Sequence, residues 1–153
     1  MDNDRIVSML NSLIEISRDG AEGFKTCAED ATDPELKMYF QNRAQGCQEA
    51  VRELSSEVRR YGGSPDTSGT ATGTLHRAWV DIRTALTSND NTAVLEECEL
   101  GETAAVMAYE NALRQEMPLD LRALLDQQYE GAKRNHDRVR QLRDQARHGV
   151  RAI

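Results

Sequence analysis

Residues 62–90, GGSPDTSGTATGTLHRAWVDIRTALTSND, connect two stretches of helical pattern and decide how those stretches are arranged. The first part, residues 62–73, is rich in Gly, Ser and Thr, a composition typical of a loop. The second part, residues 75–86, repeats apolar residues at helical spacing and predicts a short amphipathic helix. The passage is long enough to travel the length of a helix bundle, so the chain can resume at the opposite end.

Longer helical patterns lie on both sides of this passage. Apolar residues recur there at steps of three and four, which is the signature of amphipathic helices. The predicted helices cover residues 3–31, 34–61, 91–116 and 119–150. Each spans roughly 40–48 Å at about 1.5 Å per residue, and long helices of matching length pack side by side. We find no convincing strand pattern or internal repeat and expect one all-α domain over residues 1–153.

Short connections set the order of packing. Only two or three residues separate the first two helices, and the same holds for the last two, so each pair must form an antiparallel hairpin. Asp33-Pro34-Glu35 supplies a helix cap, a first-turn proline and a first-turn acid. Two antiparallel hairpins joined by a long crossover that contains a short fifth helix make up the ferritin-like four-helix arrangement. A simple up-down-up-down bundle is the alternative.

Composition excludes several classes of protein. The chain has 153 residues, 39% of them hydrophobic and 29% charged, with a net charge of −7, which fits a folded domain. No apolar run approaches the roughly 18 residues needed to span a bilayer, so we expect no membrane association. The N-terminus, residues 1–5, is acidic and lacks a signal-peptide core, which favours a cytoplasmic protein. The acidic total argues against nucleic-acid binding, because phosphate contacts need clustered Lys and Arg.

The three cysteines do not form a disulfide framework. Cys27, Cys47 and Cys98 are odd in number and widely spaced, and no C-x-x-C pair occurs. Buried thiols are the expected state of such residues.

A dinuclear metal centre is the obvious hypothesis for a bundle of this kind. Such a centre needs two E-x-x-H pairs and two further glutamates that point inward. The residues three positions before the three histidines are Gly73, Lys133 and Gln145. The sequence therefore lacks the most diagnostic element of that site, and no cofactor is predicted; iron or another divalent metal is the alternative.

A polar layer is nevertheless predicted inside the bundle. Glu102 falls within the apolar stripe of its helix, where a carboxylate is costly unless it is paired. Arg43 lies on the apolar stripe of the second long helix. Gln128 and Asn135 are central to the stripe of the fourth, and His136 flanks it. We expect these five residues to meet around Glu102.

Three roles compete for this layer. It can be an ion-pair and hydrogen-bond network that fixes helix register. It can be a reduced metal site that uses Glu99, Glu102 and His136 as ligands. It can also be a ligand-binding or proton-transfer pocket in which Glu102 and His136 act as acid and base.

The crossover helix carries His76-Arg77-Ala78-Trp79. Trp79 is the only tryptophan, and its large apolar area can hold this helix on the bundle. The alternative is that His76, Arg77 and Trp79 belong to a subunit interface, and we expect the protein to be a homo-oligomer.

Charge is segregated along the second half of the chain. Residues 133–151 hold seven basic and two acidic side chains, whereas residues 84–113 hold six acidic and no basic ones. In an antiparallel hairpin, the acidic start of one helix lies beside the basic end of the other, and both charges complement the helix dipoles. Binding of an anionic partner by the basic stretch is the alternative.

Several pieces of the chain together resemble a bacterial family of ferritin-like four-helix bundles without an assigned function. In chain order the pieces are Leu10-Asn11-Ser12-Leu13-Ile14-Glu15, Asp19-Gly20, Gly23-Phe24, Glu57-Val58-Arg59-Arg60-Tyr61-Gly62-Gly63, Gly73-Thr74-Leu75-His76-Arg77-Ala78-Trp79, Cys98-Glu99-Leu100-Gly101-Glu102 and His136-Asp137-Arg138-Val139-Arg140.

The resemblance implies a ferritin-like fold and an association with general stress, but no known reaction. The sequence also holds no nucleophilic triad, phosphate-binding glycine loop or nucleotide fingerprint. We therefore expect a non-catalytic, stress-associated helical protein. A metal-binding ferritin-like protein with a reduced ligand set is the alternative.

Overall fold

The computed structural model describes residues 2–66 and 73–149, and side chains for residues 2–66 and 79–149. Within those ranges the chain forms five helices and no strand, so the prediction of an all-α protein is confirmed. The helices are α1 (Asn3–Asp30), α2 (Pro34–Arg60), α3 (Gly73–Thr87), α4 (Asn91–Leu113) and α5 (Leu119–Arg147).

Side-chain caps begin three of these helices. Asp2, Asp33 and Asp90 each accept a hydrogen bond from a backbone N–H in the first turn of α1, α2 and α4. These bonds satisfy donors that have no partner inside the helix. At the other end of α2, Gly62 adopts φ +84° and the amide of Gly63 donates to the carbonyl of Val58 at 3.0 Å. This glycine-based C-cap stops the helix and turns the chain outward.

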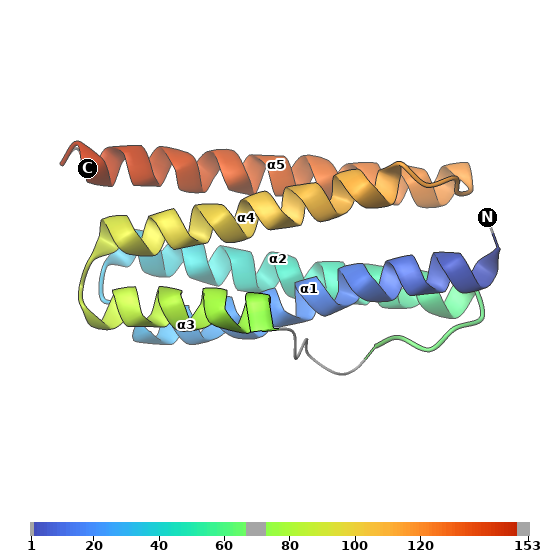
Figure 1. Ribbon diagram of the computed structural model, residues 1–153, viewed down its shortest axis with the longest axis horizontal. Coiled ribbons are helices and arrows are strands. Elements are labelled where there is room, and N and C mark those ends of the chain that lie inside the picture. The colour runs from blue at the N-terminus through green and yellow to red at the C-terminus, as the bar shows by residue number, and fades with distance from the viewer. Residues whose placement is uncertain (1, 67–72, 150–153) are drawn as a thin grey trace.

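The long helices run side by side as two hairpins (Figure 1). α1 packs along α2 and α4 packs along α5, whereas the contacts of α1 with α4 and of α2 with α5 are few. The Nδ2 of Asn91 lies 3.3 Å from the Oδ2 of Asp33, so α2 and α4 begin at the same end. An ion pair of 2.6 Å between Arg60 and Asp120 joins the end of α2 to the start of α5. α2 and α4 are therefore parallel, and α2 and α5 are antiparallel.

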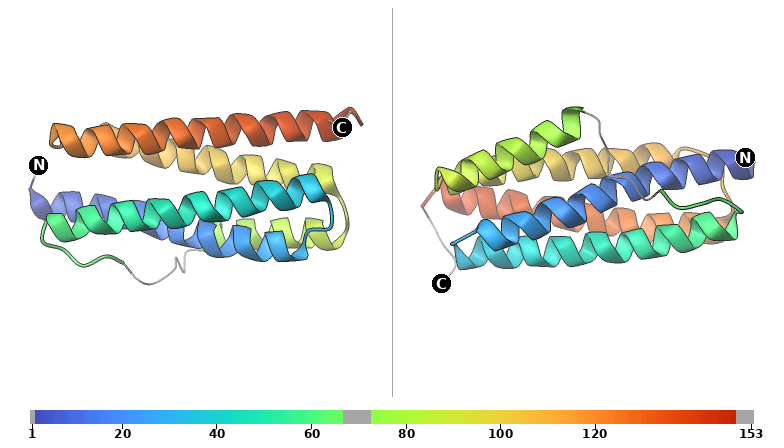
Figure 2. Two further views of the ribbon diagram at one scale, coloured as in Figure 1. Left: turned by 180° about the vertical axis from the view of Figure 1, so that it is seen from behind. Right: turned by 90° about the horizontal axis from the view of Figure 1, so that it is seen from below.

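The helix α3 lies on the outside, against α4 and α1 (Figure 2). The Trp79 ring meets the Phe24 ring edge-on, with centroids 4.9 Å apart. A Cβ atom at Gly23 would come within 2.3 Å of the indole, so this glycine provides the space in which Trp79 sits on α1. Trp79 thus packs α3 against α1. The side chains of His76 and Arg77 lie outside the described residues.

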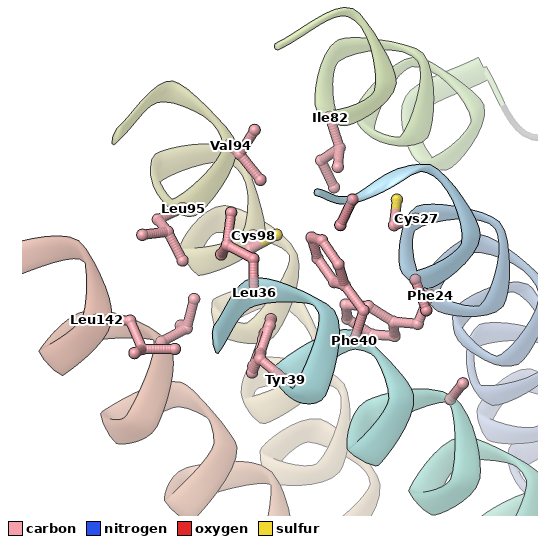
Figure 3. Close-up of a cluster of buried hydrophobic side chains, with 14 of the residues drawn as sticks. Phe24, Cys27, Leu36, Tyr39, Phe40, Ile82, Val94, Leu95, Cys98 and Leu142 are labelled. Atoms are coloured by element: carbon pink, nitrogen blue, oxygen red, sulfur yellow. The ribbon is translucent and has the colours of Figure 1, made fainter. Parts of the chain in front are cut away.

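Two separate clusters of buried apolar side chains make up the core. The first surrounds Phe40 at the end of the molecule where α1 passes into α2, and it includes Ile82 of α3 (Figure 3). The second surrounds Leu10, Leu54 and Leu125 toward the opposite end. The polar residues that the sequence places inside the bundle lie between these clusters.

Candidate functional site

Among the charged side chains that the structure describes, Glu102 of α4 is the most deeply buried, at 3% exposed. The Arg43 guanidinium binds it through two bonds, from Nε to Oε2 at 2.7 Å and from Nη2 to Oε1 at 3.0 Å. The Tyr39 hydroxyl donates a third bond to Oε2 at 3.0 Å. Both partners come from α2, so this network ties the first hairpin to the second across the interior.

Burial and charge shift the pKa values of both partners. Burial, followed by the neighbouring Glu102 carboxylate, raises the pKa of Tyr39 well above its usual value. Burial by itself lowers the pKa of Arg43, but the charge and hydrogen bonds of Glu102 outweigh it, so the pKa rises. At neutral pH the network therefore contains a neutral phenol and a charged guanidinium.

The three thiols around this network are buried and reduced, as the sequence predicts. Burial is the main cause that raises the pKa of Cys27 to about 12, and it raises the pKa of Cys47 and Cys98 as well. Because the thiolate is the nucleophile and the metal ligand, neutral thiols in this position are chemically inert.

A second polar group lies farther along the interior. Tyr109 of α4 donates to the Oε1 of Gln128 at 2.9 Å, and the Nε2 of Gln128 donates to Glu53 at 3.2 Å. Burial raises the pKa of Tyr109 to about 12, against a lowering effect of its hydrogen bond with Ser17. This chain of contacts links α4, α5 and α2.

A cavity of about 360 Å³ separates the two apolar clusters. Its lining includes Arg43 and Glu102 at one end and Tyr109 and Gln128 at the other, and Asn135 also lines it. The cavity is open to solvent at its edge, where Glu49 and Glu53 are exposed, so water or a ligand can enter it.

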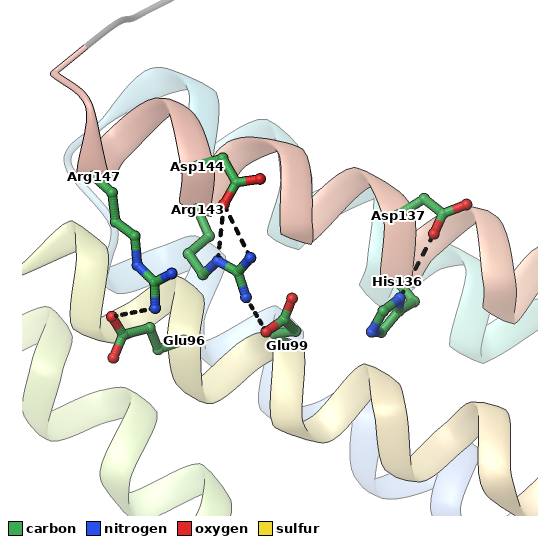
Figure 4. Close-up of polar contacts among 7 residues, drawn as sticks. All are labelled: Glu96, Glu99, His136, Asp137, Arg143, Asp144 and Arg147. Carbon is green, nitrogen blue, oxygen red and sulfur yellow. Dashed lines mark hydrogen bonds and ion pairs between the residues drawn. The ribbon is translucent and has the colours of Figure 1, made fainter.

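The structure brings some of the predicted site residues together and separates others. Arg43 and Glu102 pair directly, and Gln128 and Asn135 line the same cavity. His136 is not among the described residues that line the cavity. Its side chain is 25% exposed, and its Nδ1 lies 3.6 Å from Asp137 (Figure 4). The structure thus places Tyr39, rather than His136 or Gln128, beside Glu102.

The contact with Tyr39 is one that the sequence reasoning missed. Tyr39 lies four residues before Arg43, on the same face of α2, so helical spacing could have identified it.

The three residues proposed as metal ligands do not converge. Glu102 is held by Arg43 and Tyr39, Glu99 forms an ion pair with Arg143, and His136 lies beside Asp137 (Figure 4). Among the residues that the structure describes, no group of three or more His, Cys, Asp or Glu side chains is arranged to hold a metal ion.

The segregated charges of the second half pair with each other. Arg143 binds Glu99, and Arg147 binds Glu96 at 3.1 Å, so the basic end of α5 neutralises the acidic start of α4 (Figure 4). These contacts support the intramolecular interpretation of the basic stretch.

Nowhere in the described part of the chain is there a helix with the length and apolar character needed to cross a bilayer.

Comparison with known proteins identifies a family but no activity. None of the curated proteins matches the chain significantly. The family described as "Domain of unknown function (DUF2383)" matches residues 5–115, which is more than half of the chain and extends from α1 through α4. The chain therefore belongs to the DUF2383 family.

Proposed function

We propose that the protein is a ferritin-like four-helix bundle with a non-catalytic, stress-associated role. Two antiparallel hairpins support the fold, and so do the common starting end of α2 and α4 and the long connection between the hairpins. The parallel direction of α2 and α4 distinguishes a ferritin-like bundle from an up-down-up-down bundle, in which these two helices, the second and third long ones, would be antiparallel and every loop would be short.

The observation that carries the non-catalytic role is the pairing of the Glu102 carboxylate with protein groups. Both oxygens accept bonds from Arg43, and one also accepts from Tyr39. Three of the roughly four lone pairs of this carboxylate are therefore used, and its charge is balanced by a guanidinium rather than by a metal ion. The two hairpins share two apolar clusters, and between them the network adds directional bonds that set the register of one hairpin against the other.

Metal analysis tests this proposal against the reduced metal site. The protein is purified without chelator, incubated with Fe(II), Mn(II) or Zn(II), passed through a desalting column and analysed for metal. We expect far less than one metal ion per chain. Metal close to one ion per chain that disappears in both Glu102→Ala and His136→Ala would overturn the proposal in favour of the metal-binding alternative.

The stress association is supported by the family resemblance of the sequence pieces. It is tested by measuring the abundance of the protein in its native cell before and after osmotic, oxidative and heat challenge. We expect an increase under at least one challenge. Constant abundance under all three would remove this part of the proposal.

Self-association is part of the same proposal. Leu100 and Met107 lie two turns apart on the outer face of α4 and are 65% and 55% exposed. Two exposed apolar side chains on the side of α4 that faces away from the core favour burial of this surface against a second copy of the chain. Sedimentation velocity tests this idea: we expect an oligomer that dissociates in a Leu100→Lys, Met107→Lys variant, and a monomeric wild-type protein would contradict it.

A further inference from the structure

The cavity between the two apolar clusters has features that a purely structural network does not need. We propose that this cavity is a binding site for one small, largely apolar molecule that presents a single hydrogen-bond acceptor, such as a carboxylate, to Nη1 of Arg43. This inference goes beyond the proposed structural role, because the Arg43–Glu102 pair holds the hairpins together whether or not a ligand is present.

The size of the cavity is suited to a ligand. About 360 Å³ lies within the range of small-molecule sites, which is roughly 300–1,000 Å³. All four long helices contribute to the lining, together with Trp79 and Ile82 of α3. The space is therefore built by the tertiary structure as a whole and is not a surface depression on one helix.

The glycines of the lining differ in what they do. A Cβ at Gly20 would come within 2.8 Å of the Cys47 sulfur, so close packing explains that glycine. A Cβ at Gly101 would meet no atom within 4 Å, although Gly101 lies inside α4, where glycine weakens a helix. Packing does not require a glycine at position 101, and the space beside it is open to a ligand.

The walls determine the chemical class. Phe24, Trp79, Leu13 and Ile82 provide apolar and aromatic surface, which favours a largely apolar molecule. Most polar groups in the cavity are already bonded, since Tyr109 donates to Gln128 and Gln128 donates to Glu53.

Arg43 retains a donor group on the cavity side. Glu102 binds Nε and Nη2, whereas Nη1 lies toward Gly46, where an added Cβ would be 3.2 Å away. The Cys47 thiol already forms a side-chain hydrogen bond with Arg43, but a thiol is only a weak acceptor. A ligand carbonyl or carboxylate is a stronger partner for this N–H group.

Charges at the rim limit the charge of the ligand. Glu49 and Glu53 of α2 are exposed at the edge of the cavity, opposite Arg134 of α5. Two carboxylates against one guanidinium disfavour a multiply charged anion such as a phosphate ester. The site thus fits a neutral acceptor or a single negative charge.

Two fluorescent probes test the site directly. They are 1-anilinonaphthalene-8-sulfonate, which carries one anionic acceptor group, and N-phenyl-1-naphthylamine, which lacks it. We expect each to bind the wild-type protein at one site per chain, with the anionic probe bound more tightly. Binding of many probe molecules per chain, or equal affinity for both probes, would contradict the proposal.

A matched pair of leucine substitutions tests whether the probes occupy the cavity. Gly101→Leu places a side chain in the cavity, whereas Ala123→Leu adds a leucine to an exposed position of α5 away from the cavity. We expect Gly101→Leu to weaken both probes by about tenfold or more, because the leucine occupies the volume that they need, and Ala123→Leu to leave them unchanged. If the two variants weakened probe binding equally, or if neither weakened it, the proposed binding site would be wrong.

A paired replacement tests the role of Arg43. In the Arg43→Met, Glu102→Met variant both charges are removed together, so neither is left buried alone. We expect the anionic probe to bind about tenfold more weakly and the neutral probe to bind as before, since a charged hydrogen bond has been lost. Retention of the preference for the anionic probe would overturn the assignment of Arg43. If this variant does not unfold cooperatively, a competition experiment on the wild-type protein replaces it. We expect 2-naphthoate to displace the probes at lower concentration than naphthalene, and equal displacement by the two would overturn the assignment of Arg43.

Discussion

Glu99 and Glu102 lie one turn apart on α4, and both bind an arginine, but the two ion pairs have different surroundings. Glu102 points into the molecule and meets Arg43 of α2, with both side chains largely buried. Glu99 points toward α5 and meets Arg143; the two arginines are equally exposed at 13%, but 20% of the Glu99 side chain is exposed against 4% of the Glu102 side chain. The first pair joins the two hairpins, and the second joins the two helices of one hairpin.

The comparison shows that residue type does not determine what an ion pair contributes. A buried charge has lost its hydration, so the loss of its partner is expensive. A charge near the surface can return to water when its partner is removed, and salt screens its interaction. We therefore expect the structural role of the network around Glu102 to be sensitive to substitution and that of the α4–α5 pairs to be tolerant.

Substitution of Glu102 should produce the largest effect. Glu102→Ala leaves the Arg43 guanidinium buried without a counter-charge, and we expect the free energy of unfolding in urea to fall by about 3–5 kcal/mol. The paired Arg43→Met, Glu102→Met variant should recover most of that loss, because it leaves no lone charge. A loss below about 0.5 kcal/mol for Glu102→Ala would mean that the buried pair does not hold the hairpins together.

Alkaline pH should act on the buried region and leave the arginine pairs at the surface intact. The pKa of Cys27 rises from 9.0 to about 12 in the folded protein. Its neutral form therefore stabilises the fold fully below pH 9, and this contribution is lost as the pH rises from about 9 toward about 12. We expect urea midpoints to fall over this range, and more gradually in Cys27→Ala. Identical pH slopes for the two proteins would show that this thiol does not contribute.

Removal of the Tyr39 hydroxyl should have an intermediate effect. Tyr39→Phe deletes one hydrogen bond to a charged group but leaves the Arg43–Glu102 pair intact. We expect a loss of about 1.5–3 kcal/mol, measured by chemical denaturation. A double-mutant cycle with Glu102→Ala should show that most of this loss disappears once the carboxylate is absent.

Disruption of the outermost pair should have the smallest effect. Glu96 and Arg147 are about half exposed, so Glu96→Ala should lower the stability by less than about 1 kcal/mol. High salt should further reduce the loss of stability caused by Glu96→Ala, whereas the loss caused by Glu102→Ala should persist in high salt. A salt-insensitive loss as large as that of Glu102→Ala would remove the distinction between the two regions.

Local pattern was sufficient for much of the fold. The apolar spacing predicted the helices, and the Asp33-Pro34 cap and Gly62 marked ends that the structure shows within a few residues. The inward direction of Glu102 and Arg43 also followed from helical periodicity, because a residue's face depends only on its position along one helix.

The partners across the interior could not be found in the same way. Asn135 and His136 are neighbours in sequence, and both were predicted for the polar layer. Asn135 lines the cavity, whereas His136 lies beside Asp137. A rotation of α5 by a fraction of a turn decides between these outcomes, and periodicity does not define that rotation closely enough.

The amino-acid sequence alone determined the helices, their caps, the hairpins implied by short turns, and the need of Glu102 for a partner, since these depend on local geometry and on the cost of burying a charge. The tertiary structure decided that Tyr39 joins Arg43 on that carboxylate, that Trp79 sits over Gly23, and that a cavity separates two apolar clusters. These features depend on the distances and relative heights of different helices, which are set only when all of the side chains pack together.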